Sequence, residues 1–269
     1  MGTNALLQLI KTMKVIASSG PRYATFFVNT GCNRRCAYCS VPEQGSGIEL
    51  PPNDWHNITN RVTSWGVRFV SILGGEPTLR KDLSEIVGYV SAKAVVGLTS
   101  NGDTFVGPKG RKRLQVLASQ GLSVLNLSLH NLHQADRQIE ILQFARKLGI
   151  VPILATVVTK PTIGRLPEIM KEANRRGVMY RYSLYQNVGG AFSSAVNGLM
   201  PEPDQLVTFV AAVCIQQQKT HLIPNSQMYM TQGTDAYPRG WHCDINKDHW
   251  VVVDNEGRLM ACSEYPTQV

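Results

Sequence analysis

Short apolar runs alternate with longer amphipathic patterns through most of the chain. Runs bounded by turn residues predict strands, and apolar positions that recur every three to four residues predict helices. Strands are expected over residues 23–29, 67–73, 94–99, 123–128, 151–158 and 179–185. Helices are expected between them over residues 54–65, 81–92, 110–120, 134–148 and 166–176. Such repeats predict an α/β fold with a parallel sheet and outer helices, too short for a closed eight-stranded barrel.

The pattern divides the chain into four parts. Residues 1–20 predict an N-terminal amphipathic helix, and residues 21–186 hold the strand-helix repeats. In residues 187–219 the Gly189-Gly190 pair breaks the period, which resumes as a helix over 204–217. Residues 220–269 predict a separate extension with a β-hairpin over 251–260, whose turn is Asp-Asn-Glu-Gly.

Composition narrows the class of protein. An apolar fraction of 43% in 269 residues is typical of a globular enzyme, and no run of 18 apolar residues occurs. The N-terminus shows no signal-peptide pattern, so we expect a soluble, cytoplasmic protein without a membrane partner. The formal net charge of +8 suits an anionic substrate or an acidic electron donor. Because the basic residues are scattered, nucleic acid is not an expected partner.

Three cysteines follow the first predicted strand in the stretch Gly-Cys-Asn-Arg-Arg-Cys-Ala-Tyr-Cys-Ser, namely Cys32, Cys36 and Cys39. Three thiolates on one loop could hold three irons of a four-iron cluster and leave the fourth iron open to an outside ligand. A zinc site would need a fourth Cys or His nearby. The first histidine after these cysteines, His56, lies in a predicted helix. Zinc and three unrelated buried cysteines are the alternatives.

A second motif follows the second predicted strand, in the stretch Ser-Ile-Leu-Gly-Gly-Glu-Pro-Thr-Leu over residues 71–79. Together and in this order, the two motifs resemble those of the radical S-adenosylmethionine (radical SAM) enzymes. The resemblance implies a partial (β/α)6 barrel, a 4Fe-4S cluster on the three cysteines and SAM at the open iron. It also implies that the amino group of SAM binds the turn formed by Gly74, Gly75, Glu76 and Pro77.

Other contacts to SAM are expected where parallel strands end, because sites in such barrels lie at their carboxyl edge. The resemblance implies that Tyr38, before the third cysteine, packs near the adenine. Polar residues at later strand ends are further expected contacts: Ser100, Asn101, Ser128, His130, Thr156 and Tyr182. His130 is also a candidate acid or base for catalysis. A structural turn or a surface position would explain several of them equally well.

The resemblance implies a reaction. Flavodoxin or ferredoxin would reduce the cluster, SAM would be cleaved to methionine and a 5'-deoxyadenosyl radical, and the radical would abstract hydrogen from a substrate or add to it. We expect a small-molecule biosynthetic substrate, with a nucleotide-like or phosphorylated one favoured by the positive charge. The alternatives are maturation of a ribosomally made peptide or protein side chain, and an iron-sulfur sensor without turnover.

The hairpin region carries two further cysteines, Cys243 and Cys262. Their spacing resembles the opening of the SPASM or twitch extensions, in which such a hairpin helps to ligate an auxiliary iron-sulfur cluster. Three interpretations stay open. A second cluster could be completed by Cys214 or by His242, the chain could be truncated before the remaining ligands, or the hairpin could carry no cluster.

Overall fold

The computed structural model describes residues 22–39, 41, 47–185, 198–225 and 250–260. Six parallel strands form its centre: β1 (Tyr23–Phe27), β2 (Phe69–Leu73), β3 (Val95–Ser100), β4 (Val124–Ser128), β5 (Val151–Val158) and β6 (Met179–Leu184). The helices between them are α2 (Pro52–Ser64), α3 (Leu83–Lys93), α4 (Gly107–Ser119), α5 (Ala135–Lys147) and α6 (Leu166–Arg175), and α7 (Pro203–Gln217) follows β6. The predicted strand-helix repeats and α/β class are confirmed.

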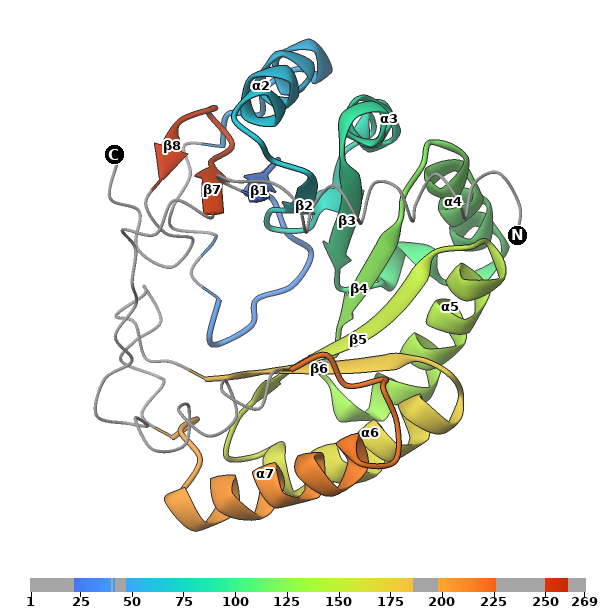
Figure 1. The fold of residues 1–269 in the computed structure, drawn as a ribbon, viewed down its shortest axis with the longest axis vertical. Helices are drawn as coiled ribbons and strands as arrows, with labels where there is room; N and C mark the ends of the chain where they lie inside the picture. Colours follow the sequence, from blue (N-terminus) through green and yellow to red (C-terminus); the bar gives the residue numbers. More distant parts are fainter. Residues whose placement is uncertain (1–21, 40, 42–46, 186–197, 226–249, 261–269) are drawn as a thin grey trace.

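The sheet is an open arc. Its described strands run in the order β6-β5-β4-β3-β2-β1-β7-β8, with β6 and β8 at the two ends. The helices cover the convex side, and the loop after β1 lies on the concave side (Figure 1). Parallel neighbours require long crossover connections, and the helices supply them. The result is the partial barrel expected from the sequence.

The hairpin strands β7 (Trp250–Val253) and β8 (Leu259–Met260) are part of the same sheet. β7 pairs with β1 in parallel, and β8 returns antiparallel. Gly257 has a φ of 81° in the turn, a conformation that a residue without Cβ adopts without strain. The predicted hairpin is therefore present, and its pairing with β1, which was not predicted, extends the barrel by two strands.

Local sequence explains the helices. Pro52 and Pro203 stand in the first turns of α2 and α7, where proline loses no hydrogen bond. In α6 the buried side chains recur at helical spacing, at Leu166, Ile169, Met170 and Ala173. These faces pack on the convex side of the sheet, as in the contact of Phe26 with Trp55, whose ring centroids are 5.1 Å apart.

Short 3-10 turns follow four of the strands, at the edge where the site lies: η2 (Pro77–Leu79), η3 (Asp103–Phe105), η4 (Leu132–Gln134) and η5 (Ile163–Arg165). None of the described helices has the length and apolar character needed to cross a membrane.

Candidate active site

The three cysteines of the loop after β1 line one small pocket at the carboxyl edge of the sheet, which we call the cluster pocket. Within the loop, the amide of Cys39 donates to the carbonyl of Cys36 (3.0 Å), and the amide of Arg34 donates to Sγ of Cys32 (3.3 Å). The cluster pocket measures about 160 Å³. Its other described lining residues are Arg34, Tyr38, Leu73, Gly74, Gly75, Glu76, Thr99, Ser100, Asn101, Ser128 and His130.

The two sequence motifs pack directly on each other. The amide of Gly75 donates to the carbonyl of Asn29 (2.9 Å), and the amide of Glu76 donates to that of Gly31 (2.8 Å). A Cβ on Gly74 would overlap Asn29 Oδ1, and one on Gly75 would overlap the carbonyl oxygens of residues 30 and 31. The two glycines are thus needed for close backbone approach, which holds the cysteine loop against the turn after β2.

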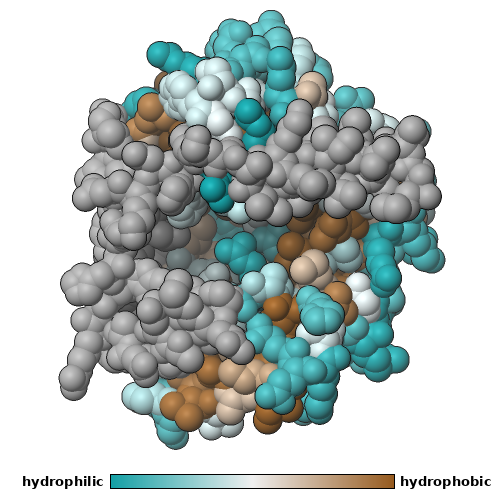
Figure 2. Space-filling view, viewed as in Figure 1, coloured by the Kyte–Doolittle hydropathy of each residue, from teal (hydrophilic) through white to brown (hydrophobic). Residues whose placement is uncertain are grey.

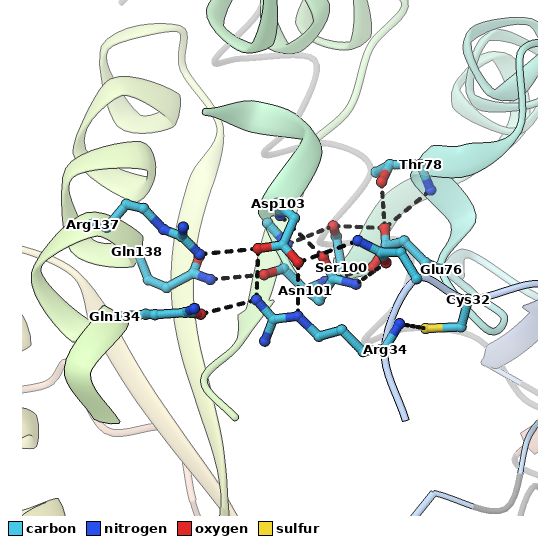
Figure 3. A network of polar contacts seen from close by, with 12 residues as sticks. Cys32, Arg34, Glu76, Thr78, Ser100, Asn101, Asp103, Gln134, Arg137 and Gln138 are labelled. Carbon is cyan, nitrogen blue, oxygen red and sulfur yellow. Dashed lines mark hydrogen bonds and ion pairs between the residues drawn. The ribbon is translucent and has the colours of Figure 1, made fainter. Parts of the chain in front are cut away.

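The side chain of Glu76 joins the ends of β2 and β3 (Figure 3). Its Oε1 accepts from the amide and hydroxyl of Thr78 (3.1 and 2.5 Å) and from Ser100 Oγ (2.8 Å), and its Oε2 accepts from the amide of Asn101 (2.7 Å). Glu76 is only 1% exposed. A buried carboxylate needs such donors, and here they also fix the position of the residues that follow β3.

An ion-pair network that sequence reasoning missed anchors the cysteine loop on the opposite side (Figure 3). Arg34 donates to both carboxylate oxygens of Asp103, through Nε at 2.8 Å and Nη2 at 2.6 Å, and Nη2 also donates to Gln134 (2.9 Å). Arg137 of α5 donates to the same carboxylate (3.0 Å). The hydrogen bond from Arg34 holds the pKa of Asp103 below its usual range. Two features of the sequence could have indicated this ion pair: Asp103 follows the third strand two positions after Asn101, and the cysteine loop contains Arg34 and Arg35.

We expect that replacing Asp103 with alanine loosens the cysteine loop. The Arg34 side chain is 16% exposed and would lose a bidentate partner, so the loss of stability should be on the order of 1 kcal/mol. Iron release from the reconstituted protein to a chelator should then be about fivefold faster. Arg137→Gln removes the outer contact only and is the matched control. Equal release rates in the two variants would contradict the anchoring role.

Tyr38 and His130 meet inside the cluster pocket. The hydroxyl of Tyr38 lies 2.5 Å from Nδ1 of His130. Burial, followed by the charge of Arg34, lowers the pKa of His130 to about 4, so its ring is neutral near pH 7. Which of the two groups donates depends on whether the ring proton lies on Nδ1 or on Nε2. Burial also raises the pKa of Tyr38 above its usual range.

Two of the predicted contacts lie outside the cluster pocket. The hydroxyl of Thr156 lies 2.7 Å from that of the buried Tyr180, and Tyr182 packs edge-on against Phe209 of α7 at 5.0 Å. Neither residue lines the cluster pocket among the described residues, although Thr156 lines the larger cavity beside it, and Pro77 is buried in η2. In β6 the even-numbered side chains are the buried ones, so Tyr182 lies on the face away from the cavity that Arg181 and Ser183 line.

A larger cavity of about 760 Å³ occupies the concave side of the sheet, and we call it the lumen cavity. It shares Tyr38, Cys39, Leu73, Gly74, Thr99, Ser128 and His130 with the cluster pocket. Figure 2 shows the molecule hollowed at the centre of one face. Sequence reasoning did not place Arg181 or Trp250 in any pocket, yet both line this cavity, and the Trp250 indole donates to Thr25 Oγ1 (2.9 Å).

The residues present fit an iron-sulfur cluster. Burial and the neighbouring thiols Cys39 and Cys32 raise the pKa of Cys36 to about 11. Neighbouring thiolates repel one another, so these thiols do not ionise together on their own. Bound iron would offset their negative charges and allow all three to act as ligands. No three His, Cys, Asp or Glu side chains in the described ranges converge on a point that a single ion could occupy. Three thiols on one short loop that line a single pocket suit separate irons of one cluster.

The proposed ligands of a second cluster, Cys243, Cys262 and His242, lie outside the described residues. Cys214 is partly buried on α7, which packs on α6 near the β6 end of the sheet, whereas the hairpin forms the other end. The auxiliary cluster, the N-terminal helix over 1–20 and the four-part division of the chain stay predictions. Iron counts before and after Cys262→Ala would test the second cluster, and an unchanged count would exclude Cys262 as a ligand.

The curated proteins that the chain resembles in sequence include two kinds of cyclase. The PqqA peptide cyclase of Bradyrhizobium diazoefficiens is 32% identical over 154 residues, covering 52% of this chain and 40% of that protein. A probable GTP 3',8-cyclase of Methanopyrus kandleri is 31% identical over 159 residues, covering 54% of this chain and 50% of that protein. The chain spans half or less of the length of these two relatives.

The fold is similar to that of Streptococcus suis SuiB, solved with its precursor peptide SuiA. The TM-score is 0.71 at 18% identity, covering 99% of this chain and 66% of SuiB. The family model described as the radical SAM superfamily matches residues 26–178, which include both motifs and the strands up to the start of β6. With the paired motifs around one pocket, this match shows that the chain belongs to the radical SAM superfamily, whose cofactors are a 4Fe-4S cluster and SAM.

Proposed function

We propose that this protein is an enzyme that cleaves SAM reductively and directs the resulting radical at a substrate in the lumen cavity. One observation carries the proposal: the cluster pocket adjoins the lumen cavity, and the two share lining residues, among them Cys39, Ser128 and His130. A cofactor held by the cysteine loop would therefore face the space in which a substrate can bind. A sensor cluster would have no need of such a cavity.

The residues of the chain divide the work. Cys32, Cys36 and Cys39 would hold the cluster, and the turn from Gly74 to Glu76 would present acceptors to the amino group of SAM. When bound and reduced, the cluster supplies the electron that cleaves SAM to methionine and a 5'-deoxyadenosyl radical.

The remaining pocket residues would position SAM. Ser100, Asn101 and Ser128 line the cluster pocket and would orient its polar groups. Tyr38 would pack near the adenine, and its hydrogen bond to His130 fixes both rings. The walls of the sheet would help to shield the radical from water. Flavodoxin or ferredoxin is the proposed electron donor, and a reducing compartment such as the cytoplasm would keep the thiols available.

The proposed substrate is a small molecule. A cavity of about 760 Å³ matches the size of sites that enclose small ligands. The named activities of the relatives include both a peptide cyclase and a GTP cyclase. Peptide modification is the second candidate, favoured by the 32% identity to a peptide cyclase.

Anaerobic reconstitution with iron and sulfide, followed by dithionite and SAM, tests the proposal. We expect 5'-deoxyadenosine and methionine to form, with chromatography as the measurement. Protein that holds an intact cluster but yields no 5'-deoxyadenosine would instead support a non-catalytic iron-sulfur sensor.

A further inference from the structure

Arg181 lines the lumen cavity and lies level, in the register of the sheet, with a residue that lines the cluster pocket. On β6 the side chains of Tyr180 and Tyr182 are buried among the helices, so Arg181 between them faces the concave side. The register places it level with Ser128, because Ser128 pairs with Ala155 of β5 and Ala155 pairs with Arg181. Two strand spacings separate the backbones of Ser128 and Arg181, roughly 10 Å.

The charge of Arg181 is unbalanced within this cavity. Among the described residues that line the lumen cavity, Arg181 is the only one with a charged side chain (Asp, Glu, Lys or Arg). Its side chain is exposed, and no hydrogen bond or ion pair joins its guanidinium to another residue in the part of the chain that the structure describes. The neighbouring Ala155 has a small side chain, which leaves room for a ligand between Arg181 and Ser128.

We propose that Arg181 binds an anionic group of the substrate, a carboxylate or a phosphate. A guanidinium presents planar paired donors that match both groups, and partial enclosure by the sheet strengthens the interaction. The anion would sit beside the opening of the cluster pocket, so the rest of the substrate would lie across the face of Ser128 and His130. This inference rests on the proposed function, since it names the substrate class of the same site.

SAM itself carries a carboxylate, which is the rival ligand for Arg181. The lining of the cluster pocket contains the hydroxyl of Ser128 and the guanidinium of Arg34, which is paired with Asp103. Arg181 lines the lumen cavity and is not among the described residues of the cluster pocket. The affinity for SAM therefore separates the two ligands: a substrate contact leaves it intact, and a SAM contact does not.

Equilibrium dialysis of the reconstituted enzyme with SAM bound tests the inference, using radiolabelled pyrophosphate in one arm and radiolabelled citrate in the other. We expect at least one anion to bind the wild type and Arg181→Gln to weaken it tenfold or more. Arg181→Lys should retain part of the affinity, because it keeps the charge and loses the paired donors. Arg175→Gln, on the exposed side of α6, is the control of equal charge change. Preference for pyrophosphate would indicate a phosphorylated substrate, and preference for citrate a carboxylate.

Three results would overturn the inference. The first is that neither anion binds the wild type, and the second is that Arg175→Gln weakens binding as much as Arg181→Gln. The third is a tenfold loss of SAM affinity in Arg181→Gln, which would assign the guanidinium to SAM. None of these measurements needs turnover. Absence of 5'-deoxyadenosine in the wild type would contradict the proposed enzymatic function but would not contradict anion binding by Arg181.

Discussion

Replacing Cys36 with alanine is expected to remove the cluster and to abolish 5'-deoxyadenosine formation. Each of the three thiols is expected to hold a different iron, so two thiolates cannot support a cluster that already has one iron without a protein ligand. Cys36 is the middle ligand and stands in hydrogen-bonded contact with Cys39 through the backbone. Iron and sulfide analysis of the reconstituted variant should show a loss of about four iron atoms per chain.

Cys214→Ala is the matched control for this substitution, because it removes a thiol on α7 that packs against the core away from the cluster pocket. It should retain the iron and the activity of the wild type. Full iron content in Cys36→Ala would refute the assignment of the three-cysteine loop as the cluster site. Loss of iron in Cys214→Ala would instead identify Cys214 as a ligand of a second cluster.

Replacing Glu76 with alanine is expected to destabilise the apoprotein by about 3 kcal/mol. The substitution leaves four buried donors without an acceptor, from Thr78, Ser100 and Asn101. It also frees the end of β3 from the turn after β2, so SAM affinity should fall together with stability. Urea unfolding of the cluster-free protein measures the first effect, and SAM binding to the reconstituted protein measures the second.

Glu76→Gln separates the two roles of this side chain. Its amide oxygen can keep the contacts to Thr78 and Ser100, but its NH2 group would face the amide of Asn101, so an intermediate loss of stability is expected. An unfolding free energy of Glu76→Ala within about 0.5 kcal/mol of the wild type would contradict the bracing role.

The sequence predicted the cysteine loop and the Gly-Gly-Glu turn, because each motif depends only on residues that are close in sequence. The three-cysteine loop and the Gly-Gly-Glu turn both follow strands, and parallel strands bring their carboxyl ends to one edge. The strands and helices were found within a few residues of their observed bounds, since apolar periodicity reflects burial directly. Ser100, Asn101, Ser128 and His130 were found by the same reasoning and line the cluster pocket.

The sequence by itself thus determined the order of strands and helices, the cysteine loop and the turn that packs on it. The tertiary structure decided which faces of β5 and β6 meet the lumen, and so turned Tyr182 away and Arg181 inward. It also paired β7 with β1, where Tyr23 and Trp250 are 227 positions apart. The ion pair of Arg34 with Asp103 joins residues 69 positions apart. Pairings over such separations depend on the closure of the whole sheet, which no local pattern encodes.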